Sequence, residues 1–458
     1  MPILPLDTKK VVPPNLPAAP PTYARKYHDA LNDVLRLYFN QLSNLLRLFV
    51  DNQGPYGIFG SGSASDAFSR LRTTHPITLF DSKQIHDNQP LFWDDSETSG
   101  SGTSSTHSAN LARSRMSVGA TTAGVRIRQT YQSFNYQPGK SHLILLTAVI
   151  GAGGTGLTQR IGYGDAENGL FFEVDDGVMY VNVRSFGTGS AVNTRVAQAD
   201  WNEDTLDGNG VSGLTADWDK TLIFVIDFSW LGVGSIRFGV IVNSIVYYVH
   251  QVDNSNTLAV VYMSKPNLPL RFEIENDGTG IAYNLDHICA TVISESANTL
   301  GITRSASTAG APVVTTTEDV VYALMGIRLK TAYIGAVVKL ISVSIQIQTV
   351  SEIGEWSLIL NPTVASTFTY ADVTNSAVQV IAGVAANTVT NGTVLKSGFL
   401  ESDSAGGKTI EVPLTEADNA RYLGANIAGT MDTLALCWTP RGGTSAGSVE
   451  GSLTWQEL

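Results

Sequence analysis

The chain has 458 residues, a length sufficient for about two to four domains, each with its own hydrophobic core. Only 15% of the residues are charged, where about a quarter is usual, which favours a protein whose surface is partly covered by neighbours. The net charge is −12 and lysine and arginine form no cluster longer than a pair, so we expect no direct nucleic-acid binding.

The first 22 residues are rich in proline, which excludes a helix or a central strand and predicts an extended arm. They lack a basic stretch followed by an apolar one, so we expect no secretory signal. The most apolar run, residues 143–156, is too short and too glycine-rich to cross a bilayer. We therefore expect a soluble protein without a membrane span, made in the cytoplasm.

The segment 23–53 predicts one strongly amphipathic helix, which spans residues 23–50 and stops at the run 51–55 that contains Gly54 and Pro55. Its apolar residues recur in alternating steps of four and three, which places them on one seam that requires an apolar partner surface. The helix is therefore predicted to dock on another chain or on the body of the protein. The predicted assembly interface consists of Leu31, Leu35, Tyr38, Leu42, Leu45 and Phe49.

Residues 54–115 contain two glycine- and serine-rich stretches, 60–63 and 99–105, with only short apolar segments between them. Such compositions are typical of flexible linkers. The sequence therefore predicts an irregular connector over this range, rather than a domain.

From residue 116 the apolar pattern changes to a period of two, which is typical of strands. The pairs Asp176-Gly177 and Asn243-Ser244 each join two such runs and predict tight hairpins. Strands without interleaved helices indicate a sandwich or jelly roll. The predicted fold is thus mainly β, with one β-sandwich over residues 116–297 and a second over 298–458, preceded by the arm and the helix.

Several runs of sequence resemble a group of virion structural proteins found in tailed phages and in some large DNA viruses. They are FNYQPGKS (134–141), NGLFFE (168–173), IDFSWLGVG (226–234), RFEIEN (271–276), LMGIRLK (324–330) and NPTVASTFTY (361–370). The resemblance covers residues 115–458 and implies a concanavalin-like sandwich followed by a second β domain, used in particles. It does not specify the part of the particle, and residues 1–53 lie outside it.

Two glycine-rich motifs invite a catalytic interpretation. Residues 151–156 satisfy G-x-G-x-x-G, but a dinucleotide site also needs a helix that begins at the motif, and the following residues show no helical period. Residues 443–447 satisfy G-x-S-x-G around Ser445, but no histidine follows as the α/β-hydrolase order requires. We interpret both motifs as loops between strands.

Two groups of acidic residues could form a ligand site or a catalytic site. Asp204, Asp207 and Asn209 could supply oxygen ligands to Ca²⁺, although their spacing is not that of an EF-hand, and a solvated hairpin tip is the favoured interpretation. Glu173 and Asp175 share one strand face and could suggest a glycosidase pair, but Asp175 adjoins the predicted turn. No enzyme activity and no cofactor are therefore expected.

The remaining chemistry-bearing residues also indicate structural roles. Cys289 and Cys437 lie in apolar runs and are expected to be buried free thiols. The seven histidines show no metal-binding spacing. Strand aromatics could line a sugar groove, but core or interface positions are the favoured interpretation. These aromatics are Trp201, Trp218, Trp230, Tyr247 and Tyr248.

These observations lead to one principal expectation and one alternative. The chain is expected to be a structural component of a virus particle, located in the virion, where it is associated with the tail, baseplate or fibre or decorates the capsid. Its expected partners are other virion proteins and further copies of itself. The alternative is an adhesin module of the virion that binds a receptor or a carbohydrate, such as a glycan of the host surface.

Overall fold

The computed structural model describes residues 75–295, 300–308, 310–365, 369–403, 408–415, 422–442 and 447–458, without the side chains of 383–386. It also describes Asn32, Asp33, Leu35, Arg36, Phe39, Asp66 and Ala67. Within these residues the protein is mainly β, as predicted, with antiparallel sheets and three short 3-10 helices, Ala109–Leu111, Gln198–Asp200 and Thr331–Tyr333. No helix in the described part of the chain is long and apolar enough to cross a membrane.

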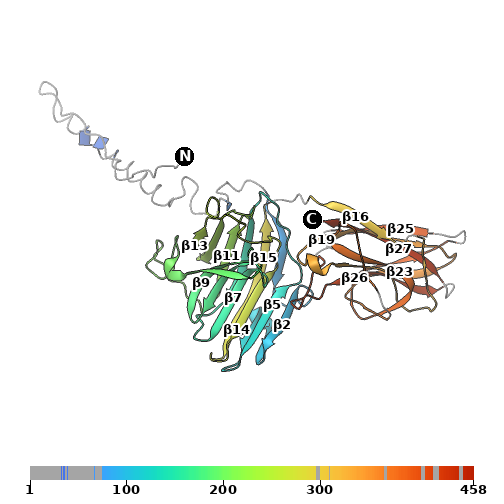
Figure 1. Ribbon diagram of the computed structural model, residues 1–458, viewed down its shortest axis with the longest axis horizontal. Helices are drawn as coiled ribbons and strands as arrows, with labels where there is room; N and C mark the ends of the chain where they lie inside the picture. Colours follow the sequence, from blue (N-terminus) through green and yellow to red (C-terminus); the bar gives the residue numbers. More distant parts are fainter. Residues whose placement is uncertain are drawn as a thin grey trace, which may run out of the picture.

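Two sheets form the first sandwich (Figure 1). The back sheet has the order β13 (Ile245–Val252), β12 (Ile236–Val242), β11 (Leu222–Phe228), β6 (His142–Val149), β15 (Tyr283–Ser294), β4 (Arg113–Val118) and β3 (Thr103–Ser108), and β1 (Ile77–Lys83) also pairs with β15. The front sheet has the order β10 (Val192–Ala197), β9 (Val178–Ser185), β8 (Gly169–Asp175), β7 (Leu157–Gly164), β14 (Leu270–Asn276), β5 (Gly124–Thr130) and β2 (Trp93–Gly100).

Two further sheets form the second sandwich, which lies beside the first in Figure 1. One has the order β16 (Ile302–Ser307), β27 (Ser448–Glu457), β19 (Val338–Ile347) and β25 (Lys408–Pro413), and β17 (Val313–Val314) pairs with β27. The other has the order β21 (Thr363–Val364), β23 (Val378–Thr390), β18 (Tyr322–Leu329), β26 (Thr433–Gly442), β20 (Ile353–Leu360) and β24 (Thr393–Glu401), and β22 (Ala371–Asp372) pairs with β23.

Each sandwich has its own core because alternate residues of each strand point between its sheets. In the first sandwich, Ile144 and Ile226 of the back sheet and Phe172 and Phe272 of the front sheet belong to one core and are all fully buried. In the second, Trp438 and Trp455 are equally buried. The predicted hairpins are confirmed: Asp176 and Gly177 take φ of 51° and 80°, and Asn243 and Ser244 take 52° and 64°.

One predicted segment needs correction. The described part of the supposed irregular connector contains β1, β2, β3 and the start of β4, all of them paired into the first sandwich. β2 and β3 read WDDSETSG and TSSTHS, so their composition resembles a linker. Both lie at sheet edges, where polar side chains are tolerated on a strand. The first sandwich therefore begins at β1.

The two sandwiches contact each other through a loop of the second. The backbone N–H groups of Tyr422, Ala425 and Ile427 donate hydrogen bonds to Gln132 Oε1 (2.9 Å), to the carbonyl oxygen of Tyr131 (3.0 Å) and to Asp94 Oδ2 (2.7 Å). Gly424 is required in this loop, because a Cβ there would lie 2.1 Å from the carbonyl oxygen of Tyr131. This close backbone approach fixes the loop against the first sandwich.

Candidate functional site: a charged face on the front sheet

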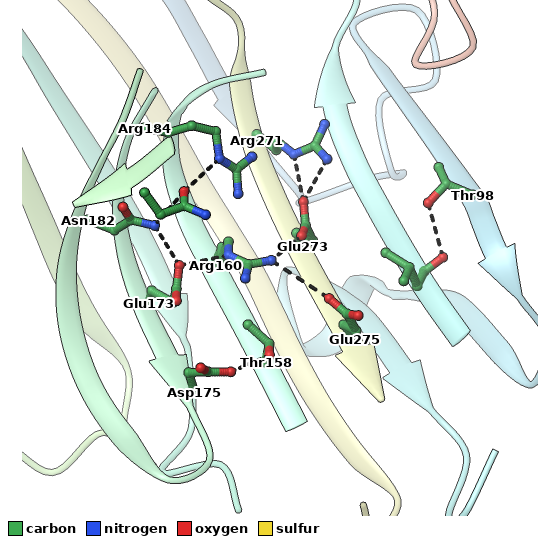
Figure 2. Close-up of polar contacts among 12 residues, drawn as sticks. Thr98, Thr158, Arg160, Glu173, Asp175, Asn182, Arg184, Arg271, Glu273 and Glu275 are labelled. Atoms are coloured by element: carbon green, nitrogen blue, oxygen red, sulfur yellow. Dashed lines mark hydrogen bonds and ion pairs between the residues drawn. The ribbon is translucent and has the colours of Figure 1, made fainter. Parts of the chain in front are cut away.

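The outer face of the front sheet carries a lattice of arginines and carboxylates (Figure 2). In β7, β8 and β14 the core-facing positions are apolar except for Gln159 and Asn276, and the alternate positions are charged or glycine except for Thr158 and Phe171. The register places Arg160 of β7 between Glu173 of β8 and Glu273 of β14. The period of two therefore brings these residues together, and the strand order determines which charges meet.

Arg160 is the centre of this lattice. Its guanidinium contacts Glu173 Oε2 at 2.7 Å, pairs closely with Glu273 and lies 3.8 Å from Glu275. The side chain is only 10% exposed, and that of Glu173 is fully buried. Burial lowers the pKa of Arg160, but the two carboxylates raise it by more, so the guanidinium stays charged.

Both carboxylates have further cationic or polar partners. Arg195 of β10 lies 2.6 Å from Glu173 Oε1, and the amide of Asn182 donates to Glu173 Oε2 at 2.8 Å. Arg271 lies 2.6 Å from Glu273 Oε2. Burial alone would raise the pKa of Glu273, but the guanidinium groups of Arg271 and Arg160 lower it to about 2.

An aromatic ring lies on the same face. Phe171 is fully buried, although it points away from the core, because its ring rests on glycines and the guanidinium of Arg184 lies 5.0 Å above it. A Cβ at Gly164 or Gly169 would lie within 2.5 Å of this ring, so both positions need glycine. The cation covers the face on which a ligand could otherwise stack.

This arrangement favours mutual neutralisation over acid–base chemistry. A glycosidase needs one carboxyl group that holds a proton near neutral pH and a second carboxylate across a cleft. Glu273 is ionised and Glu173 has partners on both oxygens, as just described. Burial raises the pKa of Glu275, but this half-buried group faces Arg160 rather than a second free carboxylate. Asp175, the other suggested member of a pair, binds Arg195 at 2.8 Å.

The suggested calcium loop uses its oxygens internally. Asp204 Oδ1 accepts a hydrogen bond from the N–H of Leu206, and Oδ2 accepts one from Ser212. Asp207 Oδ1 accepts from the Thr205 hydroxyl and from the N–H of Asn209. These contacts shape a turn. Among the described residues, no group of three His, Cys, Asp or Glu side chains could hold a metal ion.

The aromatics considered for a sugar groove have structural positions. Trp201 is buried and packs edge-on against Trp218, which itself packs against the core, as do Trp230 and Tyr247. Tyr248 lies on the outer face of the back sheet, where Arg237 stacks over its ring at 4.6 Å. These positions agree with the favoured interpretation.

The glycine motif at 151–156 lies in the loop between β6 and β7, as predicted, and residues 443–446 of the second motif lie outside the described residues. Both cysteines are free thiols; Cys437 is buried and Cys289 is half-buried. Of the predicted assembly interface, Leu35 is described: it is helical and half-buried. Leu31, Tyr38, Leu42, Leu45 and Phe49 lie outside the described residues.

The charged face was not predicted from the sequence. A signal was present, because charged or amide residues recur with a period of two in four runs: Glu173 and Asp175, Asn182 and Arg184, Asn193 and Arg195, and Arg271, Glu273 and Glu275. Each run by itself resembles an ordinary solvent-facing strand. Only the pairing of β7 with β14, more than a hundred residues apart, reveals the lattice.

No protein-family model matches the chain, and no curated protein matches it. Solved structures that resemble it include a Bacillus licheniformis β-glucanase, at 11% identity and a TM-score of 0.31, covering 48% of this chain and 98% of that one. A legume lectin-like domain from Entamoeba histolytica has 9% identity and a TM-score of 0.29, and the match covers 47% of this chain and 97% of that one. The CBM2 module of the evolved Dit of Lactobacillus casei BL23 phage J-1 has 7% identity and a TM-score of 0.33, and the match covers 49% of this chain and 99% of that one. At this similarity none of them assigns a family or a function.

Proposed function

We propose that the chain is a structural component of a virus particle, a phage virion protein with a concanavalin-like first sandwich that assembles through its N-terminal arm and helix. Its place in the particle is the tail, baseplate or fibre, or the capsid surface. Its partners there are other virion proteins and further copies of this chain.

One observation carries the proposal: the motifs that resemble virion proteins supply residues that hold the sandwich together. The run at 271–276 provides Arg271 and Glu273 of the charged face, and the run at 168–173 provides Glu173. The run at 134–141 provides Ser141, whose hydroxyl donates to Asp227 of the run at 226–234 at 2.6 Å. The resemblance thus falls on residues that make the body rigid rather than on groups available for a reaction.

The saturated contacts of the front sheet support the same conclusion. Ionised side chains that are buried and mutually paired are costly to separate, so the face keeps one geometry. A rigid β body preceded by an apolar helix seam is suited to repeated, identical contacts in an assembly. An enzyme would instead need a carboxyl group or a nucleophile that is free to react.

The test is a pair of variants in the helix. Leu42→Asp together with Leu45→Asp places two charges on the apolar seam and should abolish incorporation into particles, while circular dichroism shows that the β domains still fold. The matched control is Asp33→Ala together with Arg36→Ala, at two exposed helical positions, and should assemble normally. Incorporation is measured by cosedimentation of the protein with purified particles.

Normal incorporation of the seam variant would contradict the assembly role. Proteolysis and glycan-binding measurements distinguish the assembly role from the alternative role as an adhesin. In an assembly protein, residues 1–22 should be cut rapidly in the isolated chain and protected in the particle. Equal cleavage in both forms, together with glycan binding by the free protein, would favour an adhesin.

A further inference from the structure

The outer face of the back sheet differs from that of the front sheet. An antiparallel sheet with one buried face normally presents polar residues on the other. Here the alternate positions of β6, which point away from the core residues Ile144 and Leu146, are Leu143, Leu145 and Thr147. The same sandwich therefore has one charged outer face and one whose central strand is apolar.

Neighbouring strands extend this apolar surface. In the register, Leu145 lies between Thr291 of β15 and Val225 of β11, and Thr147 lies between Cys289 and Ile223. Ile223 in turn faces Ile241 of β12. These side chains are half-buried, except Val225, which is 1% exposed, and none belongs to the core between the sheets. We call this surface the back face; it consists of Leu143, Leu145, Thr147, Ile223, Val225, Ile241, Cys289, Thr291 and Ile293.

The chain enters the first sandwich at one edge of the back face. Asp66 and Ala67 are buried, at 2% and 4% exposure. The N–H of Ala67 donates to Ser141 Oγ at 3.4 Å, and the Ser235 hydroxyl donates to the carbonyl oxygen of Ala67. Ser141 immediately precedes β6 and binds Asp227, which the register pairs with Leu143. The segment that leads to the N-terminal helix is therefore anchored beside the back face.

The helix seam is long enough to cross the back face. From Leu31 to Phe49 the seam spans about 27 Å at a rise of about 1.5 Å per residue. The back face extends over four strands, from β15 to β12 by way of β6 and β11, which span about 14 Å, and four residues along β6 span about 14 Å, so the diagonal is about 20 Å. One helix laid diagonally would cover the back face.

We propose that the back face receives the apolar seam of helix 23–50 from a second copy of this chain. The described helical residues near Leu35, drawn in blue, lie away from both sandwiches in Figure 1. The 15 residues between position 50 and the anchor at Asp66 can span up to about 50 Å, which is enough to reach a neighbouring copy. The inference rests on the proposed function and names the surface on which the helix docks.

Such a contact joins two different surfaces, a helix on one copy and a sheet face on the next. An interface of this kind links copies head to tail and produces a closed ring where the rotation between copies closes, or a filament where it does not. The low charged fraction of the chain and the apolar, half-buried back face are both explained if copies cover one another in this way. Each copy gives one helix and receives another.

Cys289 provides a direct test, because this half-buried free thiol lies on the back face and the other cysteine, Cys437, is buried. In the full chain, Leu35, Leu42 and Phe49 are each replaced by cysteine in turn, and the protein is treated with a short bismaleimide. At least one variant should form covalent dimers and higher species on a denaturing gel. The same variant with Cys289→Ser should not. Arg36→Cys, at an exposed helical position, is the matched control and should give at least tenfold less product.

A second measurement does not depend on the new cysteines. Leu145→Lys places a charge at the centre of the back face and should convert the oligomers seen by light scattering into monomers, with an unchanged circular dichroism spectrum. The other outcomes overturn the inference. Dimers that persist after Cys289→Ser indicate helix pairing with helix, and a cross-link within one chain indicates that the helix docks on its own body. If no cross-link forms while the Leu42 and Leu45 variant still fails to enter particles, the proposed function stands and this receiving surface is wrong.

Discussion

His142 should make the first sandwich less stable in mild acid. This residue begins β6 and is fully buried against the rings of Tyr136 and Phe228, with centroids 5.3 and 5.6 Å away. Burial lowers its pKa from 6.5 to about 4, and hydrogen bonding with the backbone of Asn135 offsets only part of that effect. Replacing it by phenylalanine removes the titrating group and keeps a planar ring of similar size.

The direction and the size of this change in stability with pH follow from proton linkage. Below pH 6.5 the unfolded chain binds a proton at this histidine, whereas the folded chain does not do so until pH falls to about 4. The stability that depends on an uncharged His142 is therefore fully present above pH 6.5 and is lost progressively as the pH falls toward 4. At about 1.4 kcal/mol per pH unit the full loss is about 3 kcal/mol, and at pH 4.5 it is about 2.5 kcal/mol.

Hydrogen exchange measured by mass spectrometry on peptides of β6 and β11 reports the opening free energy of this sandwich alone. Between pH 7.5 and pH 4.5 the wild-type protein should lose about 2.5 kcal/mol more than His142→Phe does. The comparison isolates this residue, because the other buried histidines, His250 and His287, whose pKa values burial also lowers, are present in both proteins. An equal loss in the two proteins would refute the reasoning.

Three further predictions concern the charged face, the contact between the sandwiches and the acidic loop. Arg160→Met should destabilise the first sandwich by about 3 kcal/mol in urea unfolding, because Glu273 and Glu173 then lose a buried cation. Gly424→Val should separate the sandwiches and increase the maximum dimension in X-ray scattering, whereas Gly442→Ala, with no neighbour within 4 Å of its Cβ, should not. Asp204→Ala should cost about 1–3 kcal/mol, since two backbone N–H groups lose their acceptor, and added Ca²⁺ should change the melting temperature of neither protein.

The sequence predicted the strands that have a simple pattern. The period of two from residue 116 onward predicted strands, of which β12 is one, and both hairpins occur where Asp-Gly and Asn-Ser pairs allow positive φ. The prediction of an irregular connector was wrong for β2 and β3, because serine- and threonine-rich edge strands have the composition of a linker. Their identity depends on partners that are distant in sequence, as in the pairing of Ile77 with Ser294.

The candidate site was less predictable than the fold for the same reason. From the sequence, Glu173 could be one carboxylate of a glycosidase pair, but in the structure it is surrounded by Arg160, Arg195 and Asn182. These partners come from three different strands, so no local pattern could show that its oxygens are all engaged. The helix seam, in contrast, is a purely local pattern. Its prediction therefore depends only on helical periodicity and awaits the variants described above.

The strand order also determines when each sandwich can fold during synthesis. β15, the last strand of the first sandwich, pairs with β6, β4 and β1, and β27, the last strand of the second, pairs with β16, β17 and β19. The back sheet therefore lacks an inner strand until the ribosome has passed residue 294, and the sheet that contains β27 lacks one until it has passed residue 457. Until then the apolar edges of the neighbouring strands are open to wrong pairing, so slow translation or a chaperone at these two points should govern the yield of folded protein.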